Sequence, residues 1–139
     1  MLFRSVRLFT AVGNRVPLHA TGAGKCLLAS LPVAKRDALL GRLDLRQYTP
    51  RTLVDPAALR RALDEARERG FTIDDEEYDD GVRCVAVPVG PSSDAIASLS
   101  VSAPANRLTR QRCLELVPLL KRSAAELAAA LREKSETGS

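Results

Sequence analysis

The sequence predicts an α+β domain with antiparallel strand pairing. Two apolar segments, 83–89 and 95–102, flank a stretch rich in Gly, Pro and Ser, which is typical of a β-hairpin. The order of helices and strands is mixed, without the regular alternation that a doubly wound parallel sheet requires. The 139 residues are 45% hydrophobic and 27% charged, with no internal repeat or interior linker, so we expect one domain.

The N-terminal residues indicate two strands. Apolar side chains alternate over 6–12, which predicts a half-buried strand. Gly13-Asn14 is a turn signal. Residues 15–18 are then expected to form a short returning strand.

Three helices are predicted in the first half of the chain. A compact apolar helix is expected over 25–31, directly after Thr21-Gly22-Ala23-Gly24. Pro32 favours the start of a second helix that runs to about Leu43. Asp55-Pro56 is a good N-cap and first-turn pair and Gly70 is a good terminator, so a third helix is expected between them.

The second half is predicted to hold the strands and a long helix. Residues 71–73 form a short strand before an acidic segment, and 83–89 with 95–102 form the hairpin. Thr109 is expected to cap the long helix, and residues 133–139 to fray. The expected apolar positions of that helix include Leu116, Leu120, Leu127 and Leu131.

The net charge of +4 is unevenly distributed along the chain. Six of the seven residues from Asp74 to Asp80 are acidic, which leaves 21 basic and 11 acidic residues elsewhere, or +10. The arginines are dispersed, which favours solvated helix faces over a nucleic-acid-binding stripe. No helix-turn-helix signature with a basic recognition helix is found, so this chain alone should not read DNA sequence.

The cysteines and the apolar runs indicate a cytoplasmic protein. Cys26, Cys84 and Cys113 are odd in number and widely spaced, which argues against a disulfide scaffold and for a reducing compartment. No apolar run approaches the ~18 residues of a membrane span, so no membrane partner is expected. Charges interrupt the apolar residues at the start, which excludes a secretory signal there.

The sequence contains no motif for catalysis, a cofactor or a metal. Gly22-Ala23-Gly24-Lys25 lacks the first glycine and the final Ser or Thr of a phosphate-binding loop. No G-x-S-x-G elbow and no C-x-x-C pair occur, and His19 is the single histidine. We therefore expect a binding protein rather than an enzyme, without cofactor or metal.

Three segments can converge on a pocket for a small ligand. Thr21–Gly24 opens a helix, where free N–H groups favour an anion, although a plain helix entry would need the same small residues. Asp74 and Cys84 flank the acidic turn and can both contribute to the pocket. The alternative is that Asp74 belongs to a solvated loop and Cys84 to the core. The row Ser98, Ser100 and Ser102 shares one strand face and offers hydroxyls to a ligand or simply to solvent. His19 is interpreted as a structural hydrogen-bonding group and stays outside the site.

Five motifs, in order, resemble the effector-binding domain of IclR-type transcriptional regulators. They cover nearly the whole chain with family-like spacing, which makes the set far more specific than any one motif. The motifs are VPLHATGAGK (16–25), YTPRT (48–52), RGFTIDDEEY (69–78), GVRCVAVPV (81–89) and SLSVSAPANRLT (98–109).

The resemblance implies a GAF-like (profilin-like) fold, with helices packed on an antiparallel sheet, and a sensor for a small carboxylic or aromatic acid. In the family, the ligand carboxylate meets main-chain amides at the positions that match Ala23 and Gly24. Side chains complete the polar part of the pocket at the positions of Asp74, Cys84, Ser100 and Ser102. Asp74 beside an anion should accept a hydroxyl or be partly protonated. Val6, Leu8 and Val16 would line the rest.

The resemblance also implies how the domain acts within a longer regulator. Family members carry an N-terminal winged helix-turn-helix domain, whereas only about a dozen residues precede Gly13 here. We therefore expect that domain to be absent, the chain being an excised sensor or a truncated natural protein. Effector binding would shift a homodimer or tetramer between two arrangements and change the spacing of the DNA-binding heads. Ala103 replaces a common family glycine, which slightly alters the strand exit and bears on ligand size.

Two other functions stay open from the residues alone. A small hydrolase could use Cys84 or a serine as nucleophile, but its base would have to be His19. Rapid alkylation at neutral pH would favour that thiol enzyme. A pure oligomerisation module would form a stable dimer and show no ligand-induced thermal shift.

Overall fold

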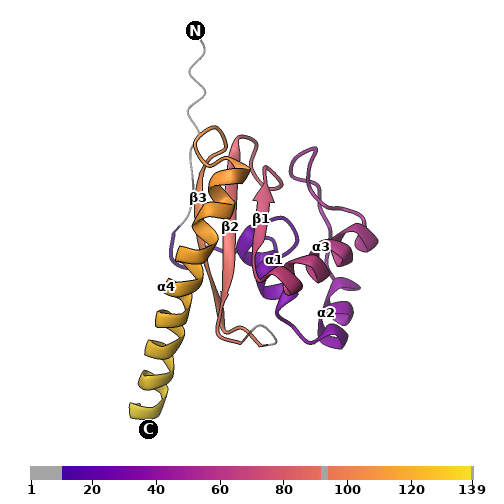
Figure 1. Cartoon of the computed structure of the whole chain (residues 1–139). Coiled ribbons are helices and arrows are strands. Elements are labelled where there is room, and N and C mark those ends of the chain that lie inside the picture. The colour runs from indigo at the N-terminus through magenta and orange to yellow at the C-terminus, as the bar shows by residue number, and fades with distance from the viewer. Residues whose placement is uncertain (1–10, 92–93, 139) are drawn as a thin grey trace.

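The protein is described by a computed structural model that covers residues 11–91 and 94–138. Its strands form one antiparallel sheet of order β1-β2-β3, with helices on both faces (Figure 1). This confirms the predicted α+β class. The elements are α1 (Gly22–Ala29), α2 (Val33–Leu40), α3 (Pro56–Arg69), β1 (Thr72–Asp75), β2 (Val82–Val89), β3 (Ala97–Pro104) and α4 (Arg110–Thr137).

Local capping signals set the helix boundaries, as predicted. The Asp55 carboxylate accepts the amides of Ala57 and Ala58 at the start of α3. Gly70 ends that helix with φ 79, a left-handed conformation that glycine adopts at little cost. The Thr109 hydroxyl accepts the Arg112 amide at the start of α4.

The predicted strand over 15–18 is wrong, because these residues form no regular element. Pro17 has no N–H to donate to a ladder, and its carbonyl accepts the Thr21 hydroxyl at 2.7 Å. The segment therefore supports the cap of α1. The predicted strand over 6–12 lies outside the described residues except for its last two, and the turn at Gly13 (φ 91) is confirmed by a bond from the Asn14 amide to the Ala11 carbonyl.

Several boundaries shift by a few residues from their expected places. Helix α1 begins at Gly22, earlier than predicted, because Thr21 is its N-cap, and it ends at Ala29. Helix α2 ends at Leu40, where Gly41 follows. Strand β3 occupies 97–104 because the Ile96 amide still closes the hairpin turn on the Val89 carbonyl.

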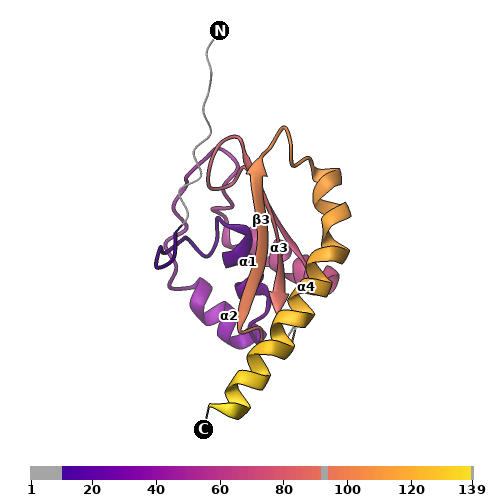
Figure 2. The same ribbon diagram turned by 90° about the vertical axis from the view of Figure 1, so that its left-hand side faces the viewer.

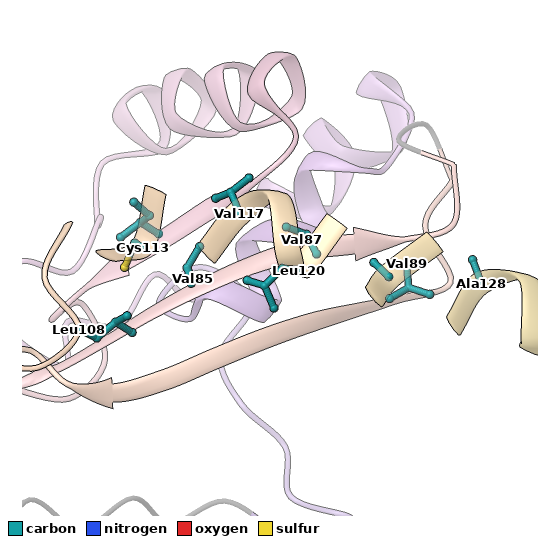
Figure 3. Close-up of a cluster of buried hydrophobic side chains, with 10 residues drawn as sticks. Val85, Val87, Val89, Leu108, Cys113, Val117, Leu120 and Ala128 are labelled. Atoms are coloured by element: carbon teal, nitrogen blue, oxygen red, sulfur yellow. The ribbon is translucent and has the colours of Figure 1, made fainter. Parts of the chain in front are cut away.

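The sheet lies between α4 on one face and α1 on the other (Figure 2). On the α4 face, Val85, Val87 and Val89 of β2 are fully buried and meet α4 side chains such as Leu120 (Figure 3). Because side chains alternate along a strand, the neighbours of these valines point to the α1 face. A second apolar cluster joins α1, α2 and α3, and its buried members are Leu28, Ala29, Leu40, Leu59, Leu63 and Ala66.

Helix α4 packs on the sheet through only some of the apolar positions named from the sequence, since Leu116 and Leu120 meet the core. Leu120 is buried, but Leu127 and Leu131 are 40% and 37% exposed. Its C-terminal end extends past the sheet (Figure 1), and the buried positions in its second half are alanines rather than leucines. The expected fraying from residue 133 is also wrong, because the helix continues to Thr137. The buried positions are Cys113, Val117, Leu120, Ala124 and Ala128.

The described part of the chain holds no helix long and apolar enough to cross a membrane.

Candidate functional site

The start of α1 lies unusually close to the sheet. A Cβ atom on Gly22 would come within 2.9 Å of the Cys84 sulfur, so a side chain there would force the helix away. The Thr72 hydroxyl donates to the Gly22 carbonyl at 2.7 Å and fixes this contact. Gly24 has a different role, because a Cβ there would lie 2.6 Å from the Leu18 backbone. The two glycines thus allow close packing on opposite sides of the helix start.

A cavity of about 450 Å³ lies between the first turn of α1, the acidic turn after β1, and strands β2 and β3. Antiparallel register brings its polar residues together, since Cys84 pairs with Asp74 on one side and with Ser102 on the other. No lysine or arginine is among its described lining residues. These are Val16, Thr21, Gly22, Ala23, Asp74, Tyr78, Asp79, Val82, Cys84, Ser100 and Ser102.

Main-chain amides at the start of α1 provide the positive end of this cavity. The Thr21 hydroxyl accepts the Gly24 amide at 3.0 Å, so this N–H is already used inside the protein. Within the described residues, no hydrogen bond is made by the amides of Gly22 and Ala23, which both line the cavity. Free first-turn amides and the helix dipole together favour an anion.

Asp74 is the buried acid of the cavity, with 5% of its surface exposed. Its Oδ1 accepts the Glu77 amide at 2.8 Å. Burial raises the pKa of Asp74 to about 7, against the lowering effect of that hydrogen bond, and the charge of Glu77 adds to the increase. The alternative of a solvated acidic loop is therefore wrong for this residue. Near neutral pH its carboxyl can be either a hydrogen-bond donor or an acceptor.

A buried ion pair holds the acidic turn beneath α1. Lys25 Nζ contacts both carboxylate oxygens of Glu77, at 2.8 and 3.0 Å, and also donates to the Ile73 carbonyl. The Glu77 carboxylate accepts the Asp75 amide as well. Sequence reasoning missed this pair, since Lys25 was considered only as part of a phosphate-binding loop. Two features of the sequence could have indicated the pair. They are a basic residue in the predicted apolar helix and the excess of acidic residues over 74–80.

The outward side of the acidic turn is an arginine-paired surface. Asp75 contacts Arg83 at 2.8 Å, Arg110 at 3.1 Å and Arg51 at 3.3 Å. Glu76 adopts φ 57, and its carboxylate accepts the Gly81 amide, which closes the turn. Consecutive acids thus have separate tasks. Asp74 lines the cavity, Asp75 and Glu76 face arginines, and Glu77 pairs with Lys25.

The loop 48–52 braces the acidic turn from outside. The hydroxyls of Thr49 and Thr52 donate to the carbonyls of Glu76 and Glu77, each at 2.6 Å. Tyr48 stacks edge-on against Tyr78, with ring centroids 5.1 Å apart. The YTPRT motif is therefore a support for the cavity wall.

The histidine base that the hydrolase alternative requires is not among the described lining residues of the cavity. Burial raises the pKa of the Cys84 thiol, although hydrogen bonding with Ser102 partly opposes the shift. His19 Nε2 is bonded to the Arg46 carbonyl at 2.8 Å, and the ring is 2% exposed. A buried thiol with a raised pKa and no histidine beside it is a poor nucleophile.

The structure brings most of the predicted site residues together. Ala23, Asp74, Cys84, Ser100 and Ser102 line the one cavity. Gly24 and Ser98 are not among its lining residues. Val16 lines the wall as expected, whereas Val6 and Leu8 lie outside the described residues.

The sheet, its covering helices and this cavity define a GAF-like binding domain. Residues 3–129 match the family described as Bacterial transcriptional regulator IclR C-terminal. The chain belongs to this family and is the effector-binding part of an IclR-type transcriptional regulator, which is not an enzyme.

Curated relatives support this assignment. The HTH-type transcriptional repressor AllR of Klebsiella pneumoniae is 39% identical over 132 residues, which are 94% of this chain and 48% of that protein. AllR of Escherichia coli K12 is 37% identical over 131 residues. The chain therefore spans about half the length of these relatives.

Solved structures show the same fold. The IclR protein of Thermotoga maritima matches with a TM-score of 0.85 at 32% identity, covering 93% of this chain and 53% of that one. The inducer-binding domain of PobR from Acinetobacter, a double mutant in complex with 3-hydroxybenzoic acid, matches with a TM-score of 0.81 at 32% identity. That match covers 90% of this chain and 73% of the PobR chain.

Proposed function

We propose that this domain senses a small carboxylic acid bound in the cavity at the start of α1. The observation that carries the proposal is the pair of first-turn amides, Gly22 and Ala23, that face a cavity without a basic side chain. These amides would hold the carboxylate by charge-assisted hydrogen bonds. Gly24 was predicted to share this task, and in the proposal it acts by letting the preceding loop pack closely.

The rest of the cavity would bind the body of the effector. Polar groups of Asp74, Cys84, Ser100 and Ser102 line one side, where they can hydrogen-bond hydroxyl or carbonyl groups. Val16, Val82 and Tyr78 supply apolar surface that suits a short aliphatic or aromatic body. The PobR domain is in complex with 3-hydroxybenzoic acid, which has a carboxylate and a hydroxyl on an aromatic ring.

The binding event would act through a larger assembly. The AllR relatives are called HTH-type repressors and are about twice as long as this chain, which is consistent with a separate DNA-binding part. We propose that the effector binds one arrangement of a homodimer or tetramer more tightly and so shifts its population. The spacing of the attached DNA-binding domains would change with it, and this chain itself would not contact DNA.

A thermal-shift screen with pyruvate, glycolate and 3-hydroxybenzoate tests the carboxylate site. Ala23→Pro removes one of the two free amides at a first-turn position where proline is tolerated. We expect it to abolish the shift given by the wild-type protein. Ala34→Pro makes the same change in the first turn of α2, away from the cavity, and should leave the shift intact. An undiminished shift in a folded Ala23→Pro variant would refute the proposed anion site.

A further inference from the structure

Strand β3 is an outer strand of the sheet with an open edge. Among the described residues it pairs only with β2, so its other edge has no partner strand. The Ala105 amide bonds to the Gly81 carbonyl, which fixes where hydrogen-bonded pairs fall along this ladder, and Pro88, which has no N–H, agrees with it. Because such pairs alternate, every second residue of β3 turns its N–H and C=O groups outward. These residues are Ser98, Ser100 and Ser102.

This edge lacks the features that usually prevent one strand from pairing with another. Residues 97–104 contain no charged side chain, and their single proline is the last residue. The register with β2 is uninterrupted over the whole strand, so no bulge bends the edge away. A long, flat and uncharged edge strand tends to pair with another strand. The open edge of β3 is therefore suited to a partner strand.

The apolar core is also incomplete on this side of the sheet. Leu99 and Val101 of β3 point to the α4 face, where they are only partly buried. Lys121 marks the flank of α4 that faces β1, since its Nζ donates to the Arg69 carbonyl just before that strand. By helical periodicity Leu119 lies on the opposite flank, towards β3, and it is 52% exposed. Apolar side chains of an added strand would cover this border.

We propose that the open edge of β3 binds the same edge of a second copy of this chain. Antiparallel pairing about a two-fold axis at Ser100 places Ser100 opposite the partner's Ser100 and Ser98 opposite the partner's Ser102. Each of these pairs exchanges two backbone hydrogen bonds. On the α4 face, Leu99 meets the partner's Val101, and aliphatic pairs of this kind stabilise antiparallel strands. No like charges meet, because the strand is uncharged.

The joined sheet would connect the assembly to the binding cavity. Its two-fold axis is perpendicular to the sheet, so both copies have α4 on one face and the cavity on the other. Ser100 lines the cavity, and the Ser100 side chains of the two copies would lie next to each other at the junction. This inference rests on the homodimer of the proposed function and gives it a contact surface.

Sedimentation equilibrium of the full chain tests the contact through a backbone change at Ser100. The wild type should be a dimer. Ser100→Pro removes the amide that faces the partner, at an outward position of an edge strand where proline is tolerated. Two hydrogen bonds are lost in each dimer, so the dissociation constant should rise about tenfold to a hundredfold. Ser100→Ala keeps the amide and should dimerise as the wild type does. Circular dichroism checks that both variants are folded.

A charge exchange at the same position tests the register. Ser100→Lys and Ser100→Asp each place like charges opposite one another at the axis, so each variant alone should dimerise less than the wild type. An equimolar mixture of the two pairs opposite charges and should restore the dimer. The outward amides of β3 should exchange slowly with solvent in the wild type and faster in each single variant.

The outcomes separate the contact surface from the assembly itself. A dimer that none of these substitutions weakens would overturn the inference alone. A monomeric wild type would overturn it together with the proposed homodimer. Slow exchange of the outward amides in that monomer would show that another part of the same chain covers the edge.

Discussion

The two faces of the sheet differ sharply, although the same strands build both. On one face, Val85, Val87 and Val89 pack against α4 and are themselves fully buried. On the other face, Cys84 lies against the start of α1 and borders a polar cavity. The alternation of side chains lets a single strand serve both purposes, with stabilising and binding residues adjacent in sequence.

The comparison teaches where stability can be sacrificed for function. The α4 face is apolar and continuous, so it can hold the sheet while the opposite face keeps unfavourable features. These are a buried acid, two unbonded amides and a cavity. Strained or costly groups are typical of functional sites in otherwise well-packed proteins.

The largest effect should come from removing one partner of the buried ion pair on the cavity face. Lys25→Met leaves Glu77 buried without its cation, and we expect a loss of about 3–5 kcal/mol in the free energy of unfolding. Urea denaturation measures it. The double variant Lys25→Met/Glu77→Gln removes both charges and should recover part of the loss. A single variant as stable as the wild type would show that the pair does not hold the acidic turn.

A cavity on the α4 face should come next. Leu120→Ala removes a buried side chain that meets the valines, and should cost about 2–5 kcal/mol of unfolding free energy. Leu127→Ala on the same helix is the control, because Leu127 is 40% exposed. Its cost should be clearly smaller. Equal costs in chemical denaturation would contradict the packing stripe assigned to α4.

The pH dependence of stability sharpens the comparison further. The pKa of Asp74 is raised to about 7 in the folded state, so the folded protein keeps a proton that the unfolded chain releases near pH 4. Its stabilising contribution is therefore present below about pH 4 and is lost between about pH 4 and 7. Relative to Asp74→Asn, the wild type should lose roughly 1–3 kcal/mol over that interval. Parallel stability curves for the two proteins would indicate an ordinary, solvated carboxyl.

The smallest effect on stability is expected at the serine row. Ser102→Ala shortens an exposed residue and removes its hydrogen bond with the Cys84 thiol, so the free energy of unfolding should change by at most about 1 kcal/mol. Affinity for a bound acid should nevertheless fall by about threefold to tenfold through one lost hydrogen bond. Ser98→Ala lies outside the cavity lining and should affect neither quantity. Calorimetric titration of both variants distinguishes a binding face from a merely solvated one.

Local signals predicted much of the fold from the sequence. Asp55, Gly70 and Thr109 set helix ends through bonds within a few residues, so their effect can be predicted without tertiary structure. The Pro17 segment and the buried stripe of α4 could not be predicted this way. The Pro17 carbonyl accepts the hydroxyl of Thr21, the N-cap of α1, which is a contact of the folded state. The buried side of α4 depends on where this helix passes the end of the sheet.

The candidate site was predicted less from local signals than from the ordered family motifs. From the residues alone, Asp74 could belong either to a solvated loop or to a pocket. Its burial depends on α1, which is far away in sequence. The pairing of Lys25 with Glu77 spans 52 residues and leaves no local pattern. The engagement of the Gly24 amide by Thr21 likewise follows from where the helix begins, one turn earlier than expected.

The most direct test of the division between the two faces is an amide chemical-shift titration. Isotope-labelled protein would be titrated in turn with glycolate, pyruvate and 3-hydroxybenzoate. We expect the largest shifts at Gly22 and Ala23, with further shifts at Asp74, Cys84 and Ser102, and no change at Leu120 on the opposite face. Saturable shifts that cluster along α4 and leave Gly22 and Ala23 unchanged would contradict the assignment of binding to the α1 face.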